Sequence, residues 1–234
     1  MKKEAFELLR EMERSWWYRG RAFAIRAVLA RARVAVPVES ILDFGAGYGG
    51  MYAELVRFGR QIYAFEPDAD ARAGAARRGY ASVYGTAENA LSEPYDLIGL
   101  FDVIEHIEDD ESFLRSLDKA LAPGGQLVIT VPAFKFLWSE HDVTHRHFRR
   151  YDRRSLSGVL SRAGYEVVVM SYWNMLLFIP AAVMRLLGHS GSSALGLSSV
   201  IDSFLRGIVA VESKMARFFA LPFGVSLVAV ARKK

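Results

Sequence analysis

The chain has 234 residues, 52% of them hydrophobic, which is enough for one domain with a substantial core. It has no cysteine, so disulfides and thiol chemistry are excluded. The net charge of +4 is a mild basic excess, compatible with an anionic partner but not diagnostic of one. The amino terminus lacks the apolar segment of a signal peptide, and no uncharged apolar run reaches the ~18 residues expected of a membrane-spanning helix.

The amino-terminal segment is expected to form two helices, near residues 3–13 and 20–33, from the spacing of its apolar side chains. The joint between them holds two adjacent tryptophans, Trp16 and Trp17, which cannot share one face of a helix. Two interpretations follow. Either both tryptophans anchor the amino-terminal helix on the core, or the joint covers a bound ligand and at least one tryptophan faces a pocket or a membrane.

A short apolar strand over residues 41–44 is followed by a glycine-rich turn and a helical pattern over residues 51–58. This order builds a nucleotide-type cradle, because glycines let the backbone approach a ligand and a helix amino terminus offers free N–H groups. The glycine spacing also fits the dinucleotide fingerprint. Asp43, however, stands just before the turn, where a carboxylate repels a pyrophosphate. It suits instead the ammonium group of S-adenosylmethionine, which carries no phosphate.

The run Asp43-Phe-Gly-Ala-Gly-Tyr-Gly resembles the first motif of the class I S-adenosylmethionine-dependent methyltransferases. The alternative is a strand, turn and helix without a ligand. The resemblance implies S-adenosylmethionine as the cofactor and, in the cradle, the cofactor-binding residues Asp43, Gly45, Ala46, Gly47 and Tyr48. If the joint around the two tryptophans covers this cofactor, Arg19 or Arg21 can pair with its methionyl carboxylate.

Apolar runs, helical spacing and chain breaks predict that strands and helices alternate along the rest of the core. Strands are expected over residues 61–65, 81–84, 95–102, 126–131, 165–171 and 225–231, and helices over 70–78, 113–121 and 152–163. This alternation predicts a doubly wound α/β sheet. The family resemblance implies a Rossmann-like sheet of seven strands in the order 3-2-1-4-5-7-6, with strand seven antiparallel, helices on both faces and a helical insertion between strands six and seven.

Two acidic positions in the first half of the core are candidates for contacts to the rest of the cofactor. Glu66 ends the second strand, where a carboxylate accepts both hydroxyl hydrogens of a ribose diol, and Pro67 stops the strand. Ala87 and Glu88 fall where the family places its adenine-contacting loop. Glu88 can equally be a charge at a helix amino terminus.

A second resemblance to the methyltransferases begins at the end of the fourth strand. Its segment, Phe101-Asp-Val-Ile-Glu-His106, is followed later by Leu121-Ala-Pro-Gly-Gly125, which predicts a helix stop and a turn. Together the motifs cover about residues 38–132. The resemblance adds to the expected cofactor contacts Phe101, Asp102 and Val103.

Methyl transfer needs alignment of donor and acceptor, exclusion of water and removal of the acceptor's proton. Histidine suits the last task because its pKa lies near neutrality. The candidates are His106, after the fourth strand, and three histidines in the loop over residues 132–151, namely His141, His145 and His147. This loop follows the fifth strand, and in an open α/β sheet ligands lie beyond the carboxyl ends of the strands.

Asp102, Glu105 and His106 are spaced i, i+3 and i+4, so on a helical turn they share one face. With a loop histidine they make a two-carboxylate, two-imidazole site for a divalent metal ion such as Mg²⁺. The pattern resembles the Glu-x-x-Glu-His site of the ubiquinone-pathway O-methyltransferases and the small-RNA 2′-O-methyltransferases, which implies an ion that holds the acceptor oxygens. Here Asp102 replaces the first glutamate. In the alternative interpretation Asp102 contacts the cofactor and Glu105 caps a helix.

Five arginines stand in and after the loop that follows the fifth strand: Arg146, Arg149, Arg150, Arg153 and Arg154. Such a run is usually a solvated face. Beside an active site it can instead bind phosphate, on a lipid or sugar carrier or on RNA. Few aromatic residues are interleaved with these arginines, which argues against a nucleic-acid partner.

The chain is expected to form one methyltransferase domain made of a helical cap, a core, an apolar helical insertion, and a last strand with a basic tail, over residues 1–35, 36–172, 173–224 and 225–234. In the insertion, residues 175–187 are apolar all round apart from Arg185, and apolar residues recur at helical spacing over 201–219. The insertion can be a lid or homodimer interface, an anchor on anionic lipid, or a surface that recognises a protein.

These features predict O-methylation of a lipophilic or lipid-linked acceptor, such as a quinone-type phenol or a polyprenyl-linked glycan, by a cytoplasmic protein that is peripheral at the inner face of a membrane. A small polar acceptor is an alternative, with the insertion acting as lid or dimer interface. An alternative from another class is a non-catalytic regulator that binds the nucleotide and has lost transfer.

Overall fold

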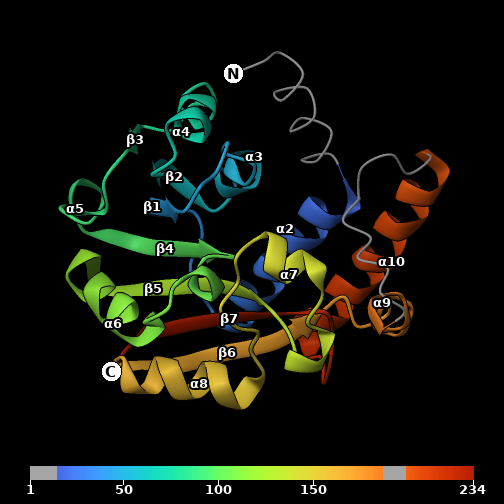
Figure 1. Cartoon of the computed structure of the whole chain (residues 1–234). Helices are drawn as coiled ribbons and strands as arrows, with labels where there is room; N and C mark the ends of the chain where they lie inside the picture. The colour runs from blue at the N-terminus through green and yellow to red at the C-terminus, as the bar shows by residue number, and fades with distance from the viewer. Residues whose placement is uncertain (1–14, 187–198) are drawn as a thin grey trace.

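A computed structural model of the protein describes residues 15–186 and 199–234, so the helix expected near residues 3–13 lies outside the described residues. Seven strands form one sheet: β1 (Val38–Phe44), β2 (Gly59–Phe65), β3 (Ser82–Tyr84), β4 (Tyr95–Phe101), β5 (Leu121–Pro132), β6 (Tyr165–Trp173) and β7 (Ser226–Lys233). Their order is β3-β2-β1-β4-β5-β7-β6, and β7 runs antiparallel to both neighbours (Figure 1). The order and the direction of β7 confirm the expected sheet.

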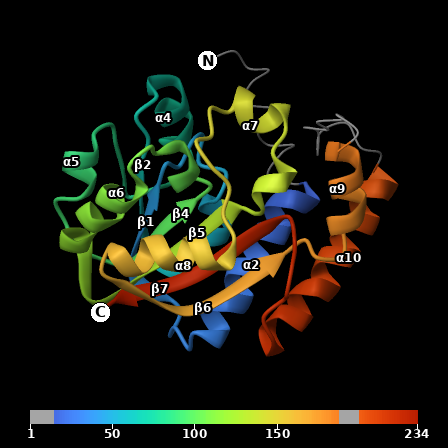
Figure 2. The same cartoon turned by 60° about the horizontal axis from the view of Figure 1, so that its bottom comes forward.

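Helices cover both faces of this sheet (Figures 1 and 2). The α-helices are α2 (Trp16–Arg31), α3 (Tyr52–Leu55), α4 (Ala69–Ala75), α5 (Ala87–Ala90), α6 (Asp110–Ser116), α7 (Glu140–Thr144), α8 (Arg153–Arg162), α9 (Phe178–Leu186) and α10 (Ser199–Phe218). Short 3₁₀ helices are η1 (Ile104–His106), η2 (Leu117–Ala120) and η3 (Lys135–Leu137). The helix expected over residues 113–121 is therefore two shorter elements, α6 and η2.

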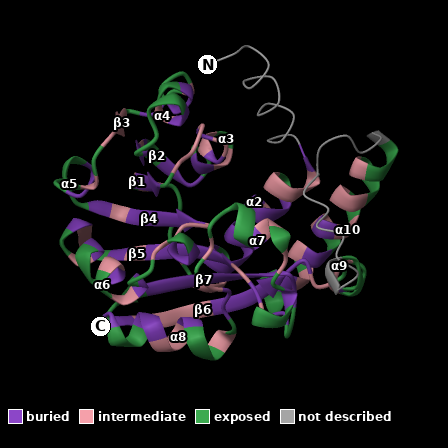
Figure 3. Ribbon diagram, viewed as in Figure 1, coloured by how far each residue is buried: buried purple, intermediate pink, exposed green. Residues whose placement is uncertain are grey.

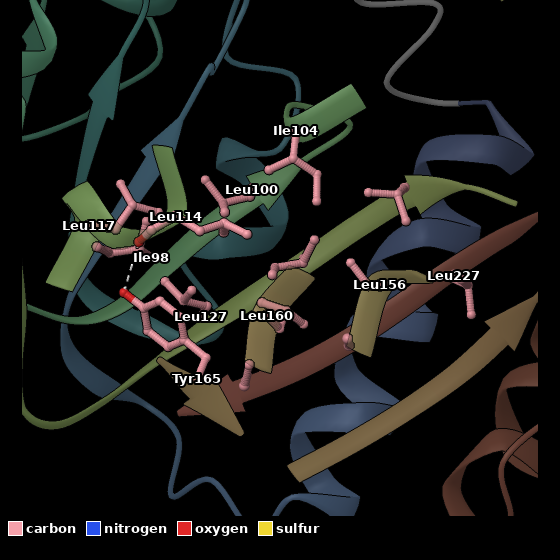
Figure 4. Close-up of a cluster of buried hydrophobic side chains, with 14 of the residues drawn as sticks. Ile98, Leu100, Ile104, Leu114, Leu117, Leu127, Leu156, Leu160, Tyr165 and Leu227 are labelled. Carbon is pink, nitrogen blue, oxygen red and sulfur yellow. Dashed lines mark hydrogen bonds between the residues drawn. The ribbon is translucent and has the colours of Figure 1, made fainter. Parts of the chain in front are cut away.

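A hydrophobic core lies on each face of the sheet, because successive side chains of a strand point to opposite sides. In β1, Leu42 belongs to the cluster shared with α6 and α8, whereas its neighbour Ile41 belongs to the cluster shared with α2. Figure 3 shows the central strands buried along most of their length. Figure 4 shows the first cluster, in which the Tyr165 hydroxyl donates a hydrogen bond to the Leu114 carbonyl at 3.1 Å. Burial on both faces explains the largely apolar runs within these strands, such as residues 127–131 of β5.

The joint expected around the two tryptophans is wrong, because α2 begins at Trp16 and both residues lie in its first turn. Trp17 packs against Trp173 at the end of β6, with ring centroids 4.7 Å apart, and Trp16 packs edge-on against Trp17. The backbone N–H of Trp16 donates to the carboxylate of Asp202 in α10 at 2.9 Å. These contacts support the interpretation that both tryptophans anchor the helix.

The turn expected over residues 122–125 is also wrong, because these residues lie inside β5. The strand starts at Leu121, which pairs with Tyr95 of β4, and the ladder resumes at Gln126. The residues between form a bulge, which requires a close backbone approach. A Cβ atom on Gly125 would lie only 2.8 Å from the carbonyl oxygen of Tyr95, so glycine is needed there.

The insertion between β6 and β7 forms α9 and α10, and α10 packs along α2. The buried carboxylate of Glu212 in α10 accepts a hydrogen bond from the N–H of Leu176 at 3.0 Å, which fixes this helix to the turn after β6. Much of α9 is exposed (Figure 3), including the apolar side chains of Ile179 and Val183. Within residues 15–186 and 199–234, none of the helices has both the length and the apolar character needed to cross a membrane.

Candidate active site

The parallel strands β1, β2, β4 and β5 bring their carboxyl ends to one edge of the sheet. Open α/β sheets bind ligands at this edge. Figure 1 shows α7, which belongs to the loop after β5, over the same edge. The candidate site therefore consists of the turns and loops that follow these four strands.

The glycine turn after β1 has the form of a ligand cradle. The N–H groups of Gly45 and Ala46 both donate to the carbonyl of Phe65 at 2.9 Å, which joins the ends of β1 and β2. Gly45 and Gly47 have positive φ angles of 79° and 55°, a conformation that glycine adopts without strain. A Cβ atom on Gly45 would lie 2.9 Å from Val103, whereas one on Gly47 would meet no described atom within 4 Å. The backbone is thus packed on one side and open at Gly47.

Glu66 is buried at the end of β2, where the sequence predicts a ribose ligand. Its carboxylate accepts hydrogen bonds from the N–H groups of Gly47 at 2.7 Å and Asp68 at 2.9 Å. A carboxylate has about four acceptor positions, so these two bonds leave capacity for a diol. Glu66 therefore holds the cradle in place, and its contact with ribose stays a prediction.

Asp43 is buried at the end of β1 and accepts a hydrogen bond from the Tyr80 hydroxyl at 2.7 Å. Burial raises the pKa of Asp43 to about 6, although the Tyr80 hydrogen bond and the nearby charge of Arg21 act against this shift. A buried carboxylate with a raised pKa gains from a cationic ligand, because the ligand charge stabilises the ionised form. The position suits an ammonium group, as the sequence predicts.

Arg21 reaches the site from α2 and forms an ion pair with Asp102, directly after β4. Asp102 has a positive φ angle of 58°, and its carboxylate also accepts a hydrogen bond from the Thr130 hydroxyl at 3.1 Å. The neighbouring cation considered from sequence, Arg19, is exposed. The structure thus selects Arg21 as the basic residue beside the cradle.

The remaining expected cofactor contacts occupy varied positions. Glu88 is exposed in the first turn of α5, the position of its alternative interpretation as a helix amino-terminal charge, and Ala87 precedes it. Phe101 is buried in the core cluster shared with α2. Pro67 follows Glu66 and is exposed, and Tyr48 lies against Gly74 of α4. Their contacts with a cofactor stay predictions.

Glu105, His106 and His147 form a second group at this edge, with potential ligand atoms all within 4.8 Å of one another. Glu105 is fully buried, and neither carboxylate oxygen has a hydrogen-bond partner among the described residues. Burial, followed by the charge of Asp102, raises the pKa of Glu105 well above its usual range. Burial and the nearby His147 lower the pKa of His106, which favours the neutral imidazole that a metal ion requires.

His147 is held by a buried network behind it. Its Nδ1 lies 2.8 Å from the Asp142 carboxylate, which also accepts hydrogen bonds from Arg150 at 2.8 and 2.9 Å. Although burial raises it, the hydrogen bonds from His147 and Arg150 hold the pKa of Asp142 well below its usual range. The ionised carboxylate places the proton on Nδ1, so Nε2 is the ligating atom. Metal-binding histidines are commonly oriented by such a carboxylate.

This geometry groups a different set of side chains from the metal ligands expected from the sequence, and binding of a metal ion stays a prediction. The group contains Glu105 and His106 but not Asp102, whose carboxylate is bound to Arg21 and Thr130. Asp102 precedes η1 with its positive φ angle and does not share a helical face with the other two. The loop histidine that completes the group is His147.

The other two loop histidines are not members of the group formed by Glu105, His106 and His147. His141 and His145 stack on each other with ring centroids 3.9 Å apart, and Nδ1 of the exposed His145 lies 2.8 Å from the carbonyl of His141. The centroid of His147 lies 4.6 Å from that of His106 but 6.1 Å from each of the other two. The structure thus favours His106 and His147 as the paired imidazoles, and a catalytic role for His141 or His145 stays a prediction.

Three of the five arginines considered as a phosphate site have partners within the protein. Arg150 binds the buried Asp142, Arg149 pairs with Asp110 at 3.0 Å, and Arg153 donates to the carbonyls of Met170 and Leu221. These contacts fix the loop after β5 and the start of α8. The arginine run is therefore mainly structural.

Comparisons with known proteins agree with this fold. The profile of the methyltransferase domain family matches residues 16–169, more than half of the chain. The chain therefore belongs to this family, as a class I S-adenosylmethionine-dependent methyltransferase domain. The family implies S-adenosylmethionine as cofactor, and the open backbone at Gly47 beside the buried Asp43 fits it.

Individual relatives are distant. The ubiquinone biosynthesis O-methyltransferase of Caulobacter sp. (strain K31) is 34% identical over 98 residues, 38% of this chain and 39% of the relative. That of Caulobacter vibrioides is 32% identical over 123 residues, 46% of this chain and 49% of the relative, so this chain spans about half or less of either relative. A methyltransferase structure from Thermotoga maritima has a TM-score of 0.58 at 20% identity and covers 98% of both chains, which shows the shared fold.

We expect S-adenosylmethionine to bind more tightly as the pH rises toward about 6, the pKa of Asp43, because only the ionised carboxylate attracts the ammonium group. The dissociation constant should fall by up to about tenfold per pH unit below that value and level off above it. Isothermal titration calorimetry measures it. Asp43→Asn should bind weakly without this dependence, and Asp70→Asn, at an exposed residue of α4, should keep it. An unchanged pH profile in Asp43→Asn would contradict the assignment.

Proposed function

We propose that this protein transfers a methyl group from S-adenosylmethionine to an oxygen of a lipophilic or lipid-linked acceptor, with a divalent metal ion at Glu105, His106 and His147. The observation that carries the proposal is the fully buried Glu105 carboxylate, which has no hydrogen-bond partner among the described residues and faces two imidazoles. An unpaired buried carboxylate is strongly unfavourable, and a bound cation removes that penalty. Two imidazoles with one carboxylate favour a first-row transition ion over Mg²⁺.

Different residues of the chain bind the cofactor and the metal ion. In this proposal Asp43 and Arg21 bind the ammonium and carboxylate groups of the cofactor, and Glu66 binds its ribose; the burial of Asp43 and the position of Glu66 at the end of β2 support these roles. S-adenosylmethionine supplies an activated methyl group, and a divalent ion supplies a Lewis acid that favours the deprotonated form of an acceptor hydroxyl. Glu105, His106 and His147 would hold that ion, while Asp142 keeps the His147 ring in its ligating orientation.

The lipophilic character of the acceptor rests on two supports. The first support is the similarity to relatives named as ubiquinone biosynthesis O-methyltransferases, which extends over 98 and 123 residues in the two cases described above. The second support is the apolar surface of α9 and α10, which expose large apolar side chains, among them Ile179, Phe204 and Phe218. With Lys214 and Arg217 on α10, this surface suits a peripheral position on anionic lipid. A homodimer through the same surface is the competing prediction.

A single experiment tests transfer and location together. The purified protein is incubated with labelled S-adenosylmethionine and vesicles made from a membrane lipid extract with added anionic lipid, and the vesicles are then floated. We expect the protein and the label in the vesicle fraction, and we expect the label to disappear after chelation of metal ions. Label in the lipid despite complete chelation would reject the metal ion, no label would reject the lipid acceptor, and protein left in the soluble fraction would reject the surface position.

A further inference from the structure

An aromatic cluster lies beside the candidate active site and is not used by the reaction described above. Its rings come from the chain after β5, from β6, from α9 and from the segment before β7; they are Phe134, Phe136, Tyr172, Phe178 and Phe223. Phe134 is central. It stacks on Tyr172 with centroids 4.9 Å apart, on Phe136 at 5.3 Å, and lies edge-on to Phe178 at 5.8 Å. Phe178 in turn contacts Phe223 at 5.3 Å.

The backbone of Phe134 is strained in a way that fixes this cluster. Its φ angle is 56° and its ψ angle 119°, a combination that residues with a Cβ atom rarely adopt. The N–H of Phe134 donates to the carbonyl of Tyr151 at 2.8 Å, and Arg150 donates to the carbonyl of Ala133 at 3.1 Å. Such strain persists only where the surroundings hold it, and it is concentrated at ligand-binding sites.

One segment, residues 148–151, links the cluster to the group that would hold the metal ion. The N–H of Phe148 donates to the carbonyl of Glu105 at 2.7 Å, and three residues later Tyr151 accepts from Phe134. Arg150, between them, binds the Asp142 carboxylate that orients His147. The same short segment therefore holds both the Asp142–His147 pair and the backbone of Phe134. Figures 1 and 2 both show α9 at the same end of the sheet as α7.

The outer rings of the cluster are open to a ligand. Phe136 is 59% exposed and Phe223 39%, whereas Phe134 and Phe178 are partly buried. Together these rings offer on the order of a few hundred Å² of apolar surface. That area is less than the ~800 Å² each partner contributes to a standard protein interface, so a second copy of the chain is the poorer occupant. It matches a single hydrocarbon chain lying across the rings.

We propose that the aromatic cluster binds the hydrocarbon or prenyl tail of the acceptor, and so selects acceptors by their tails while Glu105, His106 and His147 receive the hydroxyl. This proposal rests on the proposed function for the identity of the ligand. Phe136 and Phe178 are the specificity-determining residues, because Phe136 is the most exposed ring of the cluster and Phe178 contacts three of the other rings. Phe134 positions them through its strained backbone.

Equilibrium binding of three catechols with methyl, hexyl and decyl tails tests the proposal. Binding is followed by tryptophan fluorescence in the full-length protein loaded with Mn²⁺, without S-adenosylmethionine. In the wild type we expect about a hundredfold tighter binding of the decyl than of the methyl compound, since buried methylenes contribute additively. In the double variant Phe136→Ala/Phe178→Ala this gain should fall to about tenfold or less, with unchanged affinity for the methyl compound.

Phe218→Ala is the matched control, because Phe218 is an 83% exposed phenylalanine of α10 outside the cluster. This variant should bind the decyl compound more tightly than the methyl compound by the same factor as the wild type does. No gain in the wild type, an undiminished gain in the double variant, or a loss in the control would each overturn the proposal. If the double variant fails to fold, Phe136→Ala alone serves, with about half the loss expected. Tail-dependent binding without methyl transfer would contradict only the proposed function, whereas transfer without tail dependence would contradict only the role of the cluster.

Discussion

Replacing Glu105 by glutamine is expected to stabilise the metal-free protein and to slow methyl transfer at least about a hundredfold. The stabilisation follows from the burial of both carboxylate oxygens without a hydrogen-bond partner in the described part of the chain. Removing a buried carboxyl group that must take up a proton on folding should raise the free energy of unfolding by about 1–3 kcal/mol at neutral pH. The loss of transfer follows because a neutral amide oxygen is a poor substitute for a carboxylate ligand beside His106 and His147. A residue retained at the expense of stability is typical of a functional site.

The pH dependence of this effect has a defined sign. Burial, then the charge of Asp102, raises the pKa of Glu105 in the folded protein above its unfolded value, so the folded state binds the extra proton. The stability of the metal-free wild type should therefore be greatest below about pH 4.5 and should fall as the pH rises toward the folded-state pKa. Glu105→Gln lacks the titrating carboxyl group, so its stability does not fall with pH for this reason. The difference in stability between variant and wild type should thus widen as the pH rises.

Urea unfolding of the metal-free proteins at several pH values measures the stability, and labelled methyl transfer measures the activity. Glu108→Gln is the matched control, because Glu108 is exposed and three residues away. It should change neither the stability by more than about 0.5 kcal/mol nor the rate. A glutamine variant that is less stable than the wild type at neutral pH would show that Glu105 has a partner in the folded protein, and the proposed metal site would then lose its main support.

The strands that build the site could be predicted because the information is local. The apolar runs in β1 and β5 predict strands that are buried on both faces. The structure agrees, because Ile41 and Leu42 belong to the cores on opposite faces of the sheet. The sheet order came from the resemblance of two motifs, since strand periodicity carries no information on strand neighbours. The bulge before Gln126 was missed because it depends on the position of Tyr95 in another strand.

The candidate site could be predicted only in part, because several of its contacts join residues that are far apart in the sequence. The spacing of Asp102, Glu105 and His106 suggests one helical face, but the positive φ angle of Asp102 turns its carboxylate toward Arg21 in α2. Nothing in the local sequence predicts that ion pair. Likewise Tyr80, which donates to the buried Asp43, carries no local signal of that role.

The choice of His147 among the loop histidines illustrates the limit most clearly. In the sequence His141, His145 and His147 are equivalent members of one loop. What distinguishes His147 is the Asp142 carboxylate, and that carboxylate is held by Arg150. The spacing of an acidic residue five positions before a histidine and a basic one three positions after it is too common to identify this network in advance. The network exists only once the loop folds back on itself.

His147→Ala should lower methyl transfer about a hundredfold and remove the rise in Tm that Mn²⁺ produces in the wild type, because a metal site with two remaining protein ligands binds weakly. His145→Ala should change either quantity less than about twofold, since His145 is exposed, its Nδ1 contacts the carbonyl of His141, and it is not a member of the group of potential ligands. Both histidines belong to one loop, so the pair separates ligation from loop folding. Calorimetric Tm values with and without Mn²⁺ and initial transfer rates provide the measurements.

Adding free imidazole to the two variants tests whether the lost ring acts as a metal ligand. His147→Ala leaves Asp142 paired with Arg150, so the loop should keep its fold and leave a space the size of the lost ring. Added imidazole can donate to Asp142 and present its other nitrogen to the metal ion, as the side chain does. We therefore expect imidazole to restore roughly tenfold of the lost rate in His147→Ala and to leave His145→Ala unaffected. Equal losses in the two variants, without rescue in either, would mean that the loop histidines act through folding and that no metal ion is held at His147.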